Sequence, residues 1–181
     1  RLLTSVAPAV ANAAIKSGVA KKIIKDWLAY EDELKQRLGI DNKLVSVLTE
    51  KAQKNPKRVV FAEADNLKIL KAAQISEDEG FAFPVLLGRR ERILELIKEN
   101  NLEFENLEII DPKEESQIKK CEKFGKLFFE KRKRKGATLF ESTKLMRERN
   151  YFGAMMVETG EADALISGIT RKYSDVIKPA L

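Results

Sequence analysis

The sequence contains no histidine and a single cysteine, Cys121. Without histidine the chain lacks the usual general base near neutral pH and the commonest metal ligand, which excludes Ser-His-Asp and Cys-His catalysis within it. A lone cysteine forms no internal disulfide, so the composition favours a reducing compartment, and we expect a cytoplasmic protein. No run approaches the roughly 20 apolar residues that span a bilayer, and we expect no membrane partner and no metal site in this chain.

Proline and glycine are also scarce, at 5 and 9 residues of 181. With 44% hydrophobic and 34% charged residues, the composition is that of a folded protein with one core, or one core and an appendage. The formal net charge is +6 and the pI is near 9.3. A positive chain favours acidic partners such as phosphates, nucleotides or nucleic acid, although charge alone does not identify which.

The first part of the chain has the pattern of helices alone. Apolar residues at helical spacing predict helices at 2–17, 26–38 and 43–54. The opening residues resemble the apolar part of a signal peptide, but the pattern continues to Gly18 and there is no initiator methionine. We therefore expect an internal helix of a longer protein.

From Lys57 onward, short β-branched or apolar runs alternate with helical patterns. The runs that predict strands lie at 58–62, 83–87, 107–110 and 163–166. A long helix is predicted at 114–135, and Thr138 with Glu141 forms a capping box that predicts the next helix. This order predicts an α/β fold with an open, mostly parallel sheet and flanking helices, preceded by a short all-helical segment.

Ligands of such sheets bind beyond the carboxyl ends of the strands. The turn at 167–172 follows the fourth strand and offers backbone N–H groups, hydroxyls and a cation suited to an anion, from Ser167, Gly168, Thr170 and Arg171. Similar turns occur in many α/β proteins without a ligand, so spacing alone leaves this open. Glu63 and Asp65 follow the first strand and could bind a metal or act as acid and base, but two acidic residues in a turn are usually solvated, and we expect them to be so.

The basic run at 131–135 has two interpretations. Five consecutive cations resemble a nucleic-acid patch, since each neutralises a phosphate. The run stands at the end of a long helix without interleaved aromatic residues, however, and cations there complement the helix dipole. The second interpretation is favoured, and we expect no nucleic-acid partner.

Several ordered motifs from Lys57 onward resemble the phosphate acetyltransferase and butyryltransferase family. They include Val60-Phe61-Ala62-Glu63, Ile109-Ile110-Asp111-Pro112, Arg132-Lys133-Arg134-Lys135-Gly136, Ala162-Asp163-Ala164-Leu165-Ile166-Ser167-Gly168 and Lys178-Pro179-Ala180-Leu181. The first forty residues, with Ser17-Gly18-Val19-Ala20 and Asp26-Trp27, resemble the closing helices of a bacterial malic enzyme domain. Together they resemble the hybrid NADP-dependent malic enzymes, with residues 1–40 ending the first domain and residues 41–181 opening an incomplete transacetylase-like domain.

That resemblance implies a parent enzyme that oxidatively decarboxylates malate to pyruvate with NADP and Mg or Mn, bound by the remainder of the parent chain. It also implies a regulatory, oligomerising transacetylase-like domain that binds acetyl-CoA or a related anion, and hence a homo-oligomer. We expect no cofactor and no catalytic residue in this segment, which alone would be inactive. The alternative is a part of an active phosphate acetyltransferase, which transfers acetyl groups between acetyl phosphate and CoA.

Departures from the transacetylase pattern favour the regulatory interpretation. Where active members of the family carry a His-Ser-Ser type run, this chain has Arg171, Lys172 and Tyr173. The phosphate-clamping arginine before Pro-Ala is replaced by Lys178, which keeps the charge and loses the bidentate fork. Arg132 matches a substrate-binding arginine of the family. The resemblance thus adds Arg132 and Lys178 to the candidate binding residues.

Overall fold

The computed structural model describes residue 16 and residues 43–180. The predicted helix at 26–38, and that at 2–17 apart from Lys16, lie outside the described residues. The chain divides into two compact units, 1–54 and 55–181. Helix α3 (Lys43–Lys54) belongs to the first unit and confirms the helix predicted there.

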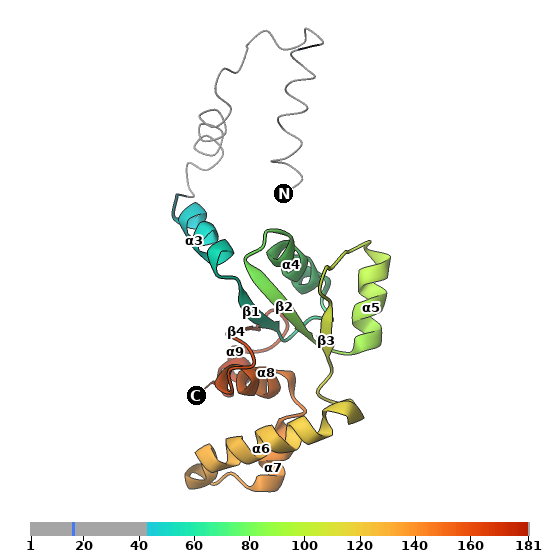
Figure 1. Ribbon diagram of the computed structural model, residues 1–181. Coiled ribbons are helices and arrows are strands. Elements are labelled where there is room, and N and C mark those ends of the chain that lie inside the picture. Colours follow the sequence, from blue (N-terminus) through green and yellow to red (C-terminus); the bar gives the residue numbers. More distant parts are fainter. Residues whose placement is uncertain (1–15, 17–42, 181) are drawn as a thin grey trace. The chain divides into compact units, whose positions relative to one another are not determined.

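The second unit contains a four-stranded, fully parallel sheet with the strand order β3-β2-β1-β4 (Figure 1). Val60 of the first strand lies opposite Val85 on one side and Leu165 on the other, which places β1 in the interior of the sheet. The strands are β1 (Lys57–Phe61), β2 (Ala82–Leu87), β3 (Glu108–Ile110) and β4 (Ala164–Ile166). The predicted open α/β fold with a parallel sheet is confirmed.

Helices connect the strands. The predicted long helix at 114–135 divides into a 3₁₀ turn, α6 and a second 3₁₀ turn that ends at Gly136, whose φ of 86° suits glycine. The capping box of Thr138 and Glu141 is present at the start of α7. The helices are α4 (Leu67–Asp78), α5 (Arg90–Glu99), α6 (Ile118–Arg132), α7 (Leu139–Leu145), α8 (Arg149–Glu158) and α9 (Tyr173–Ile177).

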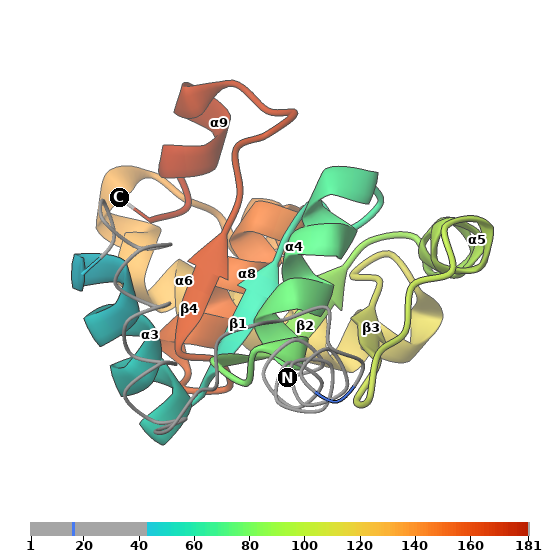
Figure 2. The ribbon, with the colours of Figure 1, turned by 90° about the horizontal axis from the view of Figure 1, so that it is seen from above.

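Apolar side chains of the sheet alternate between two cores. Val60, Val85 and Leu87 pack into a cluster with α6 and α8, whereas Phe61 and Leu86 pack into a cluster with α4 and α5. This alternation follows from the two-residue period of a strand, and helices therefore cover both faces of the sheet (Figures 1 and 2).

Two aromatic rings dominate the core on the α6 and α8 side. Phe124 and Phe152 are fully buried and meet edge to face, with their centroids 5.2 Å apart. The Lys120 ammonium lies 5.5 and 5.4 Å from these two ring centroids and 2.6 Å from a carboxylate oxygen of Glu161. Burying each ring stabilises the fold by roughly 1.5–3 kcal/mol, which makes this pair a main attachment of α6 and α8 to one another.

Glycine permits one close helix contact. A Cβ atom at Gly125 of α6 would lie 2.6 Å from Thr143 Cα of α7, closer than any side chain tolerates. The missing side chain lets α7 lie directly on α6. Cys121 of α6 and Met155 and Met156 of α8 are buried.

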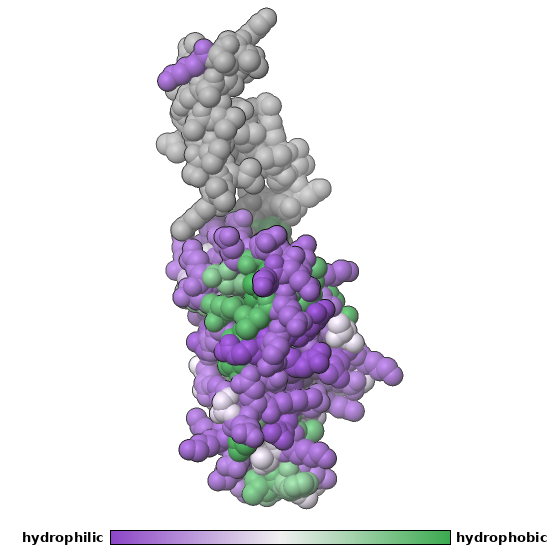
Figure 3. Space-filling view, turned by 90° about the vertical axis from the view of Figure 1, so that its right-hand side faces the viewer, coloured by the Kyte–Doolittle hydropathy of each residue, from purple (hydrophilic) through white to green (hydrophobic). Residues whose placement is uncertain are grey.

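The outer surface is mostly hydrophilic, with separate apolar patches on the face that Figure 3 shows. Among the described residues, Phe140 and Tyr173 are the most exposed large apolar side chains, each 79% exposed. In the part of the chain that the structure describes, no helix is long and apolar enough to cross a membrane.

Candidate functional site

The turns after the strands meet at one end of the sheet, because all four strands are parallel. They enclose a cleft of about 390 Å³, a size within the range of small-molecule sites. We call it the carboxyl-end cleft. Its charged lining residues are Glu63, Asp65, Arg89, Lys113, Arg147, Glu148, Arg149 and Arg171, and Ala62, Asn150 and Thr170 complete it.

Glu63 holds the turn that follows β4. Its carboxylate accepts hydrogen bonds from the N–H groups of Gly168 at 2.5 Å, Ile169 at 3.2 Å and Thr170 at 2.6 Å, and from the hydroxyls of Ser167 and Thr170. The positive φ of Gly168, 117°, turns the backbone so that these groups converge. The turn thus forms an anion-binding nest, and a carboxylate of the same chain fills it.

The expectation that Glu63 is solvated is wrong. The residue is 4% exposed, because its position at the end of the central strand β1 puts it under the turn that follows β4. Burial alone would raise the pKa of Glu63, but the hydrogen bonds from Thr170, Gly168 and Ser167 outweigh it and hold the pKa below its ordinary value. The carboxylate is therefore ionised at neutral pH.

Ser167 connects Glu63 to helix α8. Its Oγ lies 2.9 Å from Glu63 Oε1 and 2.8 Å from the side-chain oxygen assigned to Asn150. A hydroxyl carries one hydrogen, so Ser167 donates to the carboxylate when the Asn150 amide turns its NH₂ toward Oγ.

Asp65 and Arg149 form a second connection across the cleft. Arg149 donates to both carboxylate oxygens, at 2.6 and 2.8 Å, and both side chains are about four-fifths buried. Burial alone would raise the pKa of Asp65, but the hydrogen bonds and charge of Arg149, with the charge of Arg89, hold it below its ordinary value. The expectation of a solvated Asp65 is wrong as well, because Arg149 lies 84 residues further along the chain and could not be read from the turn.

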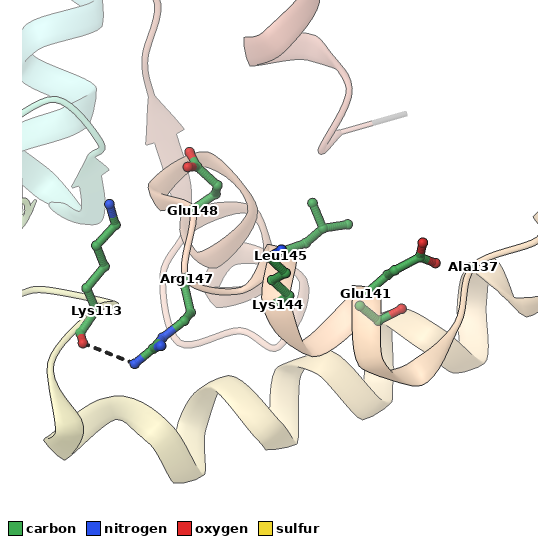
Figure 4. Close-up of a pocket in the computed structure, with 8 residues that line it drawn as sticks. Lys113, Ala137, Glu141, Lys144, Leu145, Arg147 and Glu148 are labelled. Atoms are coloured by element: carbon green, nitrogen blue, oxygen red, sulfur yellow. Dashed lines mark hydrogen bonds between the residues drawn. The ribbon is translucent and has the colours of Figure 1, made fainter.

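Further cations line the cleft from other turns. Arg147, between α7 and α8, donates to the carbonyl oxygen of Lys113 at 3.3 Å, and this bond joins the α7–α8 turn to the turn after β3 (Figure 4). Lys113, Arg147 and Glu148 also line an adjoining hollow of about 600 Å³ beside α7. Five cations and three carboxylates line the carboxyl-end cleft, a net charge of plus two.

Arg132 lies in a different place. Its guanidinium carbon is 5.8 Å from the centroid of Phe128, and it lines a groove of about 300 Å³ together with Tyr151, Leu165 and Pro179. We call this the Arg132 groove. Its neighbours in the basic run are exposed, with Lys131 paired to Glu158 and Lys133 paired to Glu130 at 2.5 Å. The run closes α6 and the following 3₁₀ turn, as the helix-end interpretation requires.

The structure divides the predicted site residues between two places. Ser167, Gly168 and Thr170 surround Glu63, and Arg171 lines the carboxyl-end cleft beside Thr170. Arg132 lines its own groove, and Lys178 is exposed at the end of α9, next to the groove residue Pro179. Sequence reasoning did not select Arg89, Lys113, Arg147 or Arg149, because cations are common in exposed turns.

Metal ligands do not gather in the described residues. No group of three or more histidine, cysteine, aspartate or glutamate side chains that could hold a metal ion occurs there.

Comparison with known proteins matches residues 43–181 to the phosphate acetyl/butaryl transferase family. The chain belongs to this family. A solved phosphotransacetylase from Streptococcus pyogenes superposes with a TM-score of 0.68 at 31% identity, covering 78% of this chain and 42% of that one.

Two groups of curated proteins are similar to the chain. A probable NADP-dependent malic enzyme of Rickettsia prowazekii is 34% identical over 98% of this chain. A phosphate acetyltransferase of Thermoanaerobacterium thermosaccharolyticum is 37% identical over 76% of this chain. The chain spans 23% of the length of the malic enzyme and 40% of the length of the acetyltransferase.

Proposed function

We propose that the chain is the phosphate acetyltransferase-like part of an NADP-dependent malic enzyme and acts there as a regulatory domain that binds acetyl-CoA or a related anion. The parent would oxidise and decarboxylate malate to pyruvate, with NADP and Mg or Mn held by other parts of the chain. The observation that carries this proposal is the extent of the similarity. Malic enzymes match 96–98% of the chain, including residues before 43, whereas phosphate acetyltransferases match 74–76%.

The geometry supports an anionic ligand. The carboxyl-end cleft has a net positive charge. Arg132 lines a separate groove, to which Leu165 of β4 and Pro179 also contribute. In this proposal Arg132, Arg171 and Lys178 supply positive charge, while Ser167, Gly168 and Thr170 fix the β4 turn through Glu63. Acetyl-CoA carries several phosphates and an uncharged acyl end, and a rim with separate hollows suits such a molecule.

A melting experiment on the full-length protein tests the proposal. Acetyl-CoA should raise the melting temperature and change the rate of malate oxidation, because a ligand that binds the folded state stabilises it. Arg132→Gln should reduce both effects, and Arg134→Gln, which removes an exposed cation of the same run outside both hollows, should leave them intact. Absence of both effects in the unaltered protein would contradict the proposal.

Active acetyl transfer is the second candidate. Phosphate acetyltransferases of two organisms are 37% and 38% identical to the chain over the region that they share, slightly above the malic enzymes. Measurement of the thiol released when full-length protein is given acetyl-CoA and phosphate separates the two functions. We expect no release, because Lys178 lacks the fork of an arginine that would clamp the phosphate.

A further inference from the structure

Helices α6 and α7 lie side by side (Figure 1), and a groove opens between them at the surface. We call it the α6–α7 groove. It encloses about 350 Å³, and the residues that line it are Ile118, Cys121, Glu122, Phe140, Thr143, Lys144 and Arg147. Phe140 of α7 is 79% exposed and Ile118 of α6 is 43% exposed. Two large apolar side chains of one groove therefore face water, and exposed apolar patches of this kind mark interaction surfaces.

Phe140 contributes little to the core of its own chain. It is the second residue of α7 and belongs to neither of the two apolar clusters around the sheet. Helix α7 is instead attached through Leu145, which packs against the cluster on the α6 and α8 side, and through the close contact of Thr143 with Gly125. The fold therefore does not depend on an aromatic ring at position 140.

The groove is large enough to receive an aromatic ring from outside. An apolar cavity of about 150 Å³ holds a benzene molecule, and the α6–α7 groove exceeds this volume. The same surface thus carries both a projecting ring and a hollow that accommodates one. A contact between two identical chains about a two-fold axis requires a surface that is complementary to itself in this way.

The charges on the two walls of the groove are also complementary. Glu122 lies on the α6 wall and Lys144 on the α7 wall. Both are exposed, and neither forms an ion pair with another described residue. A two-fold axis along the groove brings α6 of one copy opposite α7 of the other, so that each Glu122 meets a Lys144. Arg147, the other cation of the groove, already donates to the Lys113 carbonyl oxygen.

We propose that the α6–α7 groove is a two-fold interface between two copies of this chain. Phe140 of each copy packs on Ile118 in the groove of the other, and Glu122 of each copy pairs with Lys144 of the other. The buried ring is the anchor, because a few aromatic residues that fill pockets carry most of the energy of an interface. The inference goes beyond the proposed function, since it concerns a contact between chains and requires no ligand.

Sedimentation equilibrium of the chain and of Phe140→Ser tests the apolar contact. We expect the unaltered chain to associate and Phe140→Ser to halve the mass, because the anchor of the interface is lost. Ile75→Ser is the matched control and should leave the mass unchanged, since Ile75 is 56% exposed on α4, which covers the other face of the sheet. Equal masses of the unaltered chain and of Phe140→Ser would overturn the inference.

Charge reversal tests the two-fold arrangement with the apolar residues intact. Glu122→Lys and Lys144→Glu should each associate about tenfold more weakly, because like charges then meet at two places. A mixture of the two variants should recover the lost affinity, since every lysine at these positions then faces a glutamate, and this recovery also shows that both variants are folded. Unchanged association of the single variants, or a mixture that associates no better than they do, would contradict the two-fold interface.

Discussion

Arg149 donates two parallel hydrogen bonds to Asp65 and so fastens the first turn of α8 to the turn after β1. The fork of the guanidinium matches the carboxylate, and partial burial protects the pair from solvent. The pair thereby sets the distance between two walls of the carboxyl-end cleft.

A double-mutant cycle measures this pair. Asp65→Asn and Arg149→Gln should each destabilise the chain, and their coupling energy should be on the order of 1–2 kcal/mol, above the value typical of exposed pairs. The free energies of unfolding come from urea titrations. The exposed pair Lys131 and Glu158 is the matched control, with a coupling energy below about 1 kcal/mol. Equal coupling in the two pairs would refute the special role of Arg149.

Glu63→Gln should loosen the β4 turn. The amide keeps one oxygen acceptor but directs an NH₂ group at N–H donors, so we expect a loss on the order of 2 kcal/mol in the free energy of unfolding. Hydrogen exchange should speed up at those of the Gly168, Ile169 and Thr170 N–H groups that face the new NH₂ group, because they lose their acceptor. Unchanged hydrogen exchange in the variant would show that the conformation of the turn does not depend on Glu63.

Acid should destabilise the chain through Glu63 and Asp65. Both carboxyls have a lowered pKa in the folded state, so the unfolded chain binds more protons as the pH falls through roughly 4. Their contribution to stability is complete above that pH and is lost below it. Unfolding free energies between pH 7 and 3 should fall less steeply in the Glu63→Gln, Asp65→Asn double variant, and parallel curves would contradict this.

Gly125→Ala should destabilise the contact between α6 and α7. The new methyl group would overlap Thr143 Cα, and we expect a cost of roughly 1–3 kcal/mol. Gly136→Ala is the comparison, because it has open space and only the strain of a positive φ, about 1 kcal/mol. Thermal melts should show a larger loss of stability for Gly125→Ala than for Gly136→Ala. The reverse order would mean that α6 and α7 can separate without cost.

Self-association is the remaining prediction. Among the described residues β4 pairs on one side only, and Ile166 and Ile169 beside it are 47% and 48% exposed. An exposed strand edge with apolar side chains favours pairing with another chain. We expect a homo-oligomer by light scattering and a shift toward monomer in Ile166→Lys. A monomer in the unaltered chain would contradict the prediction.

Local patterns predicted the fold well. The β-branched run at 58–62 and the capping box at Thr138 depend on residues close in sequence, and the structure has a strand at Lys57–Phe61 and the capping box. The site depends on distant pairs. The donors to Glu63 lie 104–107 residues away. The spacing of residues 167–170 predicted a site for an external anion, because the local sequence does not show that Glu63 binds there.

The contact of Gly125 with Thr143 has a consequence for how ligands enter. The close approach packs α7 directly on α6, and the hydrogen bond from Arg147 to the Lys113 carbonyl joins the α7–α8 turn to the turn after β3. On the opposite side of the cleft, Arg171 follows the short turn after β4, which is held by Glu63 and by the contact of Ser167 with Asn150. We therefore expect the cleft to change its width at the turn after β4 rather than at the turn between α7 and α8.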